Sequence, residues 1–350
     1  MTISVSPQEL SGVVLGAAAL VHLPTVLAFS LPLSPSGRDW NDYTAQHVGK
    51  WSGLWTTYDS TGVERGDPDR MDTTISLSAD GKTVAHVNTL FVGSVGSDCS
   101  TCHDSVETRD IPAGQYTTET FRHRASSGCY LFGPGVTRGG DMTTELGFRL
   151  DEDRRVRVLV SHRPQANGVD PPLQLALQRI VVVRETLAAQ RQTPTSASSC
   201  WSFDRPSWLG LWRGHEMVLD DGGGDTDGGL LWKEKALPPT HLRRCRCSGA
   251  AIEDDDSHAS FELDGGILLE APKIVDAGKP AELSVRCAIG RKSNAATPNR
   301  IVQAKVRLEA LGRVVDTVRS AAGENVRIAP PKLLQLSVHS LTPVESTGLK

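Results

Sequence analysis

The tryptophan-rich pattern W-x-G-L-W occurs twice, and this repeat limits the architecture of the chain more than any other feature. Residues 51–55 read WSGLW, and residues 208–212 read WLGLW. Tryptophan is rare, with seven in 350 residues, so the recurrence indicates duplication. Solenoid repeats have periods of about 20–50 residues, and the two copies here are separated by the length of a whole domain. The chain is therefore expected to contain two related domains.

Both halves show the alternation of polar and apolar residues that is typical of strands. Residues 72–78 and 83–88 alternate around Asp80-Gly81, which is a strong hairpin signal. Further strands are expected at 142–150, 155–162, 261–270, 281–289, 300–308 and 314–318. Such spacing favours a sandwich or barrel. Helical patterns are sparse: 39–48 predicts a short helix, and 173–188 fits either a strand or a helix. The fold class is therefore all-β with a few short helices.

Composition shifts suggest the domain boundaries. A polar Thr/Ser-rich linker is expected at 189–206, between a first domain at 39–188 and a second at 207–342, with a tail at 343–350. Residues 1–38 form an apolar N-terminal segment with no Lys or Arg before Arg38. A cleaved targeting sequence, a retained anchor and a disordered start all remain open for it. Membrane contact is expected only through this segment, if it is not cleaved.

The stretch 26–30 (VLAFS) resembles the Ala–Phe junction of presequences in algae with secondary plastids. A plastid location is therefore expected, with the secretory pathway or the cytoplasm as alternatives. The formal charge of −4 shows no basic excess, so no nucleic-acid partner is expected. Phosphate-binding and nucleophile-elbow motifs are absent from the sequence, which favours a non-enzymatic function without a cofactor. A catalytic triad, however, needs no adjacency in sequence.

Seven cysteines are too few for a disulfide scaffold, and their number is odd. The segment Cys99-Ser100-Thr101-Cys102-His103 matches the attachment motif of c-type haem, but its loop between strand patterns disfavours haem. A zinc site using Cys99, Cys102 and either Cys129 or His103 is a weak alternative to a plain thiol pair. Cys245 and Cys247 alternate with arginines and are expected to point inward from a strand. The glycine-acid run 222–228 fits a hairpin loop better than a calcium site.

The G-x-W pattern near the start of each half resembles the signature of the lipocalin (calycin) barrels. Beyond this, the chain is similar to an uncharacterised family of cyanobacteria, algae and plants that consists of tandem lipocalin-like barrels. The matching stretches are 51–59, 142–146, 155–158, 263–266 with Pro272, and 300–319. The resemblance implies two tandem lipocalin-like antiparallel β-barrels. In these, Trp55 and Trp212 close one end of each barrel, with Arg184 (or Arg179) and Arg319 packed across them.

Polar residues within the strand patterns are the candidates for lining a ligand cavity: Arg70, Asn88, Glu145 and Arg157. A buried carboxylate needs a partner, so Glu145 is expected to pair with Arg157 unless both lie on the surface. Barrels of this kind hold one small ligand. The expected function is therefore non-enzymatic binding of a hydrophobic or amphipathic small molecule, pigment- or lipid-like. The alternatives are a structural or protein-interaction module with filled barrels, and a chromophore lyase-like enzyme.

Two barrels joined by a flexible linker are expected to unfold separately. Replacing Trp55 by alanine should then unfold only the first barrel, and the same change at Trp212 only the second. Truncation of a core tryptophan costs about 3–5 kcal/mol, which is enough to unfold a marginal domain.

Overall fold

The computed structural model describes residues 37–92, 107–118, 120–121, 123–136, 141–165, 174–188, 210–220, 231–242, 257–276, 278–289, 300–309, 313–315, 326–328 and 331–344. This part is nearly all β, with one helix, α1 (Gly37–His47), so the predicted fold class is confirmed. The helix is not of the length and apolarity that crossing a bilayer requires. Several expectations concern residues that lie outside these ranges. They are the expectations for segments 1–36, 189–206 and 222–228, and for Cys99, Cys102, His103, Cys245, Cys247 and Arg319.

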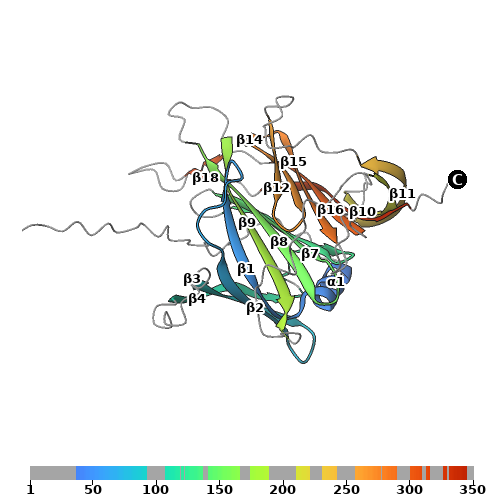
Figure 1. Cartoon of the computed structure of the whole chain (residues 1–350). Helices are drawn as coiled ribbons and strands as arrows, with labels where there is room; N and C mark the ends of the chain where they lie inside the picture. The colour runs from blue at the N-terminus through green and yellow to red at the C-terminus, as the bar shows by residue number, and fades with distance from the viewer. Residues whose placement is uncertain are drawn as a thin grey trace, which may run out of the picture.

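The first sheet is antiparallel, with the order β4-β3-β2-β1-β9-β8-β7-β6-β5, and it curls into a half-barrel (Figure 1, blue to green). Its strands are β1 (Gly49–Asp59), β2 (Asp69–Leu77), β3 (Thr83–Val92), β4 (Glu107–Thr117), β5 (Arg124–Ser126), β6 (Cys129–Val136), β7 (Met142–Arg149), β8 (Arg154–Pro164) and β9 (Gln174–Leu187). The predicted β2–β3 hairpin turns at Gly81, whose φ of +71° favours glycine. The ambiguous segment 173–188 is the strand β9.

The second sheet has the order β11-β10-β19-β16-β15-β13-β12 (Figure 1, yellow to red). Its strands are β10 (Gly210–Asp220), β11 (Leu231–Leu242), β12 (His258–Leu263), β13 (Ile267–Pro272), β15 (Pro280–Ile289), β16 (Arg300–Glu309) and β19 (Lys332–Pro343). A separate ribbon pairs β17 (Arg313–Val315) with β18 (Val326–Ile328). Of the strand expected at 314–318, the described residues 314 and 315 belong to this ribbon, whereas β16 pairs with β15 and β19.

The two sheets repeat one arrangement. In each, the first strand lies between the second and the last: β1 between β2 and β9, and β10 between β11 and β19. Trp55 and Trp212 lie on these first strands. A Cβ on Gly53 would lie 1.8 Å from the carbonyl oxygen of Arg184, and one on Gly214 would lie 1.9 Å from that of Ser340. The last strand therefore approaches the first closely at the same point in both sheets.

This close approach aligns the two copies differently from the sequence motif. Gly53 follows Trp51 by two residues, and Gly214 follows Trp212 by two. By backbone position Trp212 therefore corresponds to Trp51, whereas the W-x-G-L-W motif aligns it with Trp55. The difference is four residues along the strand, which preserves the face of the sheet because side chains alternate with a period of two.

The sheets share one hydrophobic core. The convex face of the first sheet packs on one face of the second, and the core runs from Leu146, Val158 and Val182 to Leu269 and Val285. Strand β14 (Ile274–Asp276) also pairs with β9 across the boundary. The structure thus argues against separate unfolding, because each sheet covers apolar surface that the other would otherwise expose.

Candidate functional site

Polar side chains from six strands gather on the concave face of the first sheet. Residues of β3 contact residues of β8 there, although β2, β1 and β9 lie between these strands in the sheet, so the contacts cross the interior of the curl. The side chains that meet are Thr73 (β2), His86 and Asn88 (β3), Tyr130 (β6), Glu145 (β7), Arg155 and Arg157 (β8) and Glu185 (β9). All of them are buried except Glu145, which is partly accessible.

Glu185 is the centre of this network and is completely buried. Its carboxylate accepts hydrogen bonds from Arg155 Nε at 2.6 Å, Arg157 Nε at 3.1 Å and Thr73 Oγ1 at 2.6 Å. Burial alone would raise the pKa of Glu185, but the two arginines outweigh it and lower the pKa to about 2. The carboxylate is therefore charged and saturated with partners, which is the condition for a stable buried ion.

Glu145 and Tyr130 extend the network toward the partly accessible side. Tyr130 Oη donates to Glu145 Oε1 at 2.5 Å, and Arg157 Nη1 lies 3.5 Å from the same oxygen. Arg157 Nη2 also donates to Asn88 Oδ1 at 3.3 Å, which in turn lies 3.2 Å from His86 Nε2. Burial opposes the charge on Arg157, but Glu185 and Glu145 more than offset it, so that its pKa lies above the ordinary value.

A cluster of rings lies beside this network and is called the ring cluster here. It spans the gap between the edge strand β4 and strand β6, and its members come from α1, β4, β6 and the segment between β4 and β5. They are Trp40, Tyr43, His47, Tyr116, Phe121, His123, Tyr130 and Phe132. His123 is stacked between Phe121 and Phe132, with ring centroids 4.7 and 4.6 Å apart.

Four polar atoms of the ring cluster are buried without a hydrogen-bond partner: Tyr43 Oη, both ring nitrogens of His47, and His123 Nδ1. The rings are contiguous, since Tyr43 lies 5.3 Å from His47 and 4.9 Å from His123 between centroids. Burial lowers the pKa of His123 to about 3 and that of His47 well below its ordinary value. Both imidazoles are therefore neutral near pH 7. Buried polar atoms are nearly always satisfied, and in this cluster four of the unpartnered ones lie close together.

The structure brings together three of the four residues predicted to line a cavity. Asn88, Glu145 and Arg157 meet in the network, and the expected Glu145–Arg157 pair is present. Arg70 does not join them: it is about half exposed, pairs with Asp72 and stacks over Phe91 at 4.7 Å. Within the part of the chain described, no three His, Cys, Asp or Glu side chains gather as they would around a metal ion.

The expected stacking of Arg184 on Trp55 is wrong. Trp55 faces the concave side with Val183, whereas Arg184, the next residue on β9, points to the second sheet and donates to the backbone carbonyl of Asp264. The stacked cations lie on Trp51 instead: the guanidinium groups of Arg155 and Arg149 are 4.4 and 4.5 Å from its ring centroid. The alternation of a strand explains this, because neighbouring residues cannot share a face.

Sequence reasoning missed Thr73, Arg155 and Glu185 in the network, and His47 and His123 in the ring cluster. One signal was available, since Arg155 and Arg157 alternate on a predicted strand and must share a face. Two arginines on a buried face require a carboxylate, which Glu185 supplies. No such signal pointed to the two histidines, because His47 lies on the helix and His123 in a segment without a strand pattern.

Comparison with known proteins identifies a family model that matches the first part of the chain. Residues 36–190 match the family model described as "Domain of unknown function (DUF3598), N-terminal". The crystal structure of a protein with unknown function from this family, from Nostoc punctiforme, is similar to the chain with a TM-score of 0.51 and 15% identity. The similarity covers 87% of this chain and 99% of that one, and at this identity it shows the fold alone. A search of the curated proteins finds no match.

The part of the chain that contains the first sheet should lose stability in acid. Below pH 6.5 the unfolded chain protonates His123, but the folded protein does so only near pH 3, so the free energy of unfolding falls across this range. Glu185 adds a second loss between about pH 4.5 and 2. Together they are worth on the order of several kcal/mol. Urea unfolding between pH 8 and 4 measures the slope. His123→Phe should reduce it, and His258→Gln, at an exposed site, should not.

Proposed function

We propose that the first sheet, in the part of the chain that matches the DUF3598 model, binds an uncharged amphipathic small molecule, pigment- or lipid-like, in a lipocalin-like manner on its concave face. The observation that carries this proposal is the group of four unpartnered buried polar atoms on Tyr43, His47 and His123. Neutral imidazoles and a phenol can each donate or accept a hydrogen bond. A ligand hydroxyl or carbonyl group satisfies them, while its apolar part packs against the surrounding rings.

The charges of the concave face argue for an uncharged ligand. The two arginines of the network are matched by two carboxylates, Glu145 and Glu185, and the histidines are neutral. An ionised ligand would bring an unmatched charge into a buried region, which is strongly unfavourable. A hydroxyl or carbonyl group brings no such cost. An alcohol or ketone should therefore bind better than the corresponding carboxylic acid.

One observation favours the alternative of a filled structural module. The part of the network around Glu185 has its hydrogen-bonding groups already paired, since Glu185 and Arg155 are both fully buried and hydrogen-bonded to each other. Those residues leave no group for a ligand. We assign them to structure, and we assign ligand binding to the ring cluster and to the partly accessible Glu145.

A matched pair of ligands tests the proposal on the full-length chain. Long-chain fatty alcohols and fatty acids of equal length, and a polyene alcohol with its acid, are titrated while tryptophan fluorescence and the melting temperature are followed. We expect the alcohol to bind at least about tenfold tighter than the acid. Native mass spectrometry of protein purified from its source should show a copurified neutral molecule. Absence of binding by every ligand and of any copurified molecule would favour the structural module.

His123→Phe is the matched variant for this test. Phenylalanine keeps the stacking between Phe121 and Phe132 and removes an unpartnered buried nitrogen, so the folded state should keep its stability near pH 7. Ligand affinity should fall about tenfold through the lost hydrogen bond. Unchanged affinity in a folded His123→Phe protein would place the ligand elsewhere.

A further inference from the structure

A surface pocket of about 410 Å³ lies where the first and second sheets meet, next to the C-terminal end of α1. Its walls include Gln46 at the end of α1, the β5–β6 turn at Gly128, and Arg149 and Glu152 around the β7–β8 turn. Arg300, the first residue of β16, comes from the second sheet. The pocket is therefore built from both sheets and is separate from the ring cluster.

Arg300 is a half-buried cation in this pocket. Its Nε donates to Ser340 Oγ at 3.0 Å, which orients the guanidinium group. Burial lowers the pKa of Arg300. No carboxylate among the described residues pairs with it. Half-buried arginines ordinarily have an anionic partner, so this group has unused capacity to bind one.

Arg149 supplies a second guanidinium group to the same pocket. It is held over the ring of Trp51 and donates to the backbone carbonyl of Gln46 at 3.1 Å and to that of Glu152. These hydrogen-bond partners are carbonyl groups, which position the cation, while the nearby carboxylates of Asp151, Asp153 and Glu152 favour its charged form. The neighbouring Asp151 carboxylate is already hydrogen-bonded by Arg154.

We propose that Arg300 and Arg149 form an anion site that binds the carboxylate or phosphate group of a small molecule. Guanidinium groups bind such oxygens through paired, charge-assisted hydrogen bonds, and a planar fork suits both anions. The exposed Glu152 and the partly buried Asp151 also line the pocket and oppose an anion, so their charges limit its affinity. A bound anion would join β7 of the first sheet to β16 of the second.

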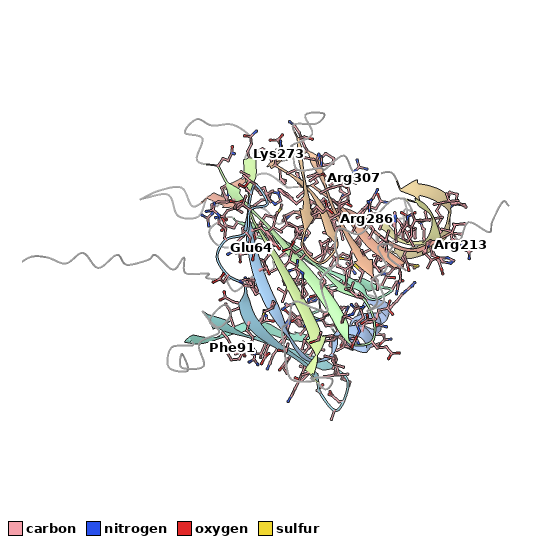
Figure 2. The ribbon with its side chains drawn as sticks, viewed as in Figure 1. Glu64, Phe91, Arg213, Lys273, Arg286 and Arg307 are labelled. Carbon is pink, nitrogen blue, oxygen red and sulfur yellow. The ribbon has the colours of Figure 1, made fainter. Side chains whose placement is uncertain are left out.

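Calorimetric titration of the full-length chain at constant ionic strength tests this site, with inorganic phosphate in one arm and succinate in the other. Arg300→Gln should weaken binding about tenfold or more, because a charge-assisted pair is lost. Glu152→Gln should tighten it about two- to fivefold, because a like charge is removed. Arg307→Gln is the matched control, since this exposed arginine lies on the same strand (Figure 2) and should leave the affinity unchanged.

The outcomes separate the alternatives. Tighter binding in the phosphate arm identifies a phosphorylated ligand, and tighter binding in the succinate arm identifies a carboxylate; either supports the site. Equal weakening by Arg300→Gln and Arg307→Gln would show non-specific attraction and overturn the proposal, as would absence of binding in both arms. Glu152→Gln, a change at an exposed residue, tests the proposal even if Arg300→Gln fails to fold. An unchanged anion affinity in Glu152→Gln would contradict binding of the anion in this pocket.

Discussion

Glu185→Gln should lower the free energy of unfolding by about 3–5 kcal/mol. Glutamine keeps the shape of the side chain but removes the charge that balances Arg155 and Arg157 in a fully buried position. The loss is large because desolvated guanidinium groups are left without their main anion, and Glu145 reaches only one of them. Urea unfolding at pH 7 measures the change.

Two further variants serve as controls for the Glu185→Gln prediction. Glu262→Gln removes the same charge from an exposed strand position and should change stability by less than about 0.5 kcal/mol. Replacing Arg155 and Glu185 together by methionine should recover part of the loss, because an apolar pair of similar size needs no solvation. A loss below about 1 kcal/mol in Glu185→Gln would mean that water reaches the network and that the concave face is not desolvated there.

Gly53→Ala should be at least as damaging, with a loss of about 4–5 kcal/mol or more. The new methyl carbon would lie 1.8 Å from the backbone oxygen of Arg184, and β1 cannot move away because β2 holds its other edge. Gly214→Ala should have the same effect in the second sheet, where the methyl carbon would lie 1.9 Å from the oxygen of Ser340. Gly37→Ala is the control, because no atom lies within 4 Å of its added carbon.

The number of transitions in calorimetry is as informative as their midpoints. Since both sheets contribute to one core, we expect a single transition in the wild type, moved to lower temperature by either glycine variant. The same holds for Trp55→Ala and Trp212→Ala, for which the sequence favours separate effects on the two domains. Two transitions, of which each variant moves only one, would show that the shared core contributes little to coupling.

Some contacts of the site can be predicted from local sequence patterns, and others cannot. Glu145 and Arg157 lie on neighbouring strands of a predictable hairpin, so their pairing follows from alternation and a short turn. Thr73 and Glu185 meet 112 positions apart in the chain, through a strand whose pattern fitted a helix equally well. Nothing local to either residue identifies the other, because the distance between them depends on how strongly the sheet curls.

The sequence by itself determined the strand content and the main hairpins, because alternation and turn residues are local properties of the chain. It also identified three of the polar residues that are buried together on the first sheet, Asn88, Glu145 and Arg157. Only the tertiary structure decided which face each of them occupies across the curl and that Arg155 and Arg149 stack on Trp51. Only the tertiary structure decided, too, that the two sheets share a single core. These outcomes depend on sheet curvature and on packing between distant segments, which the pattern of any one segment does not contain.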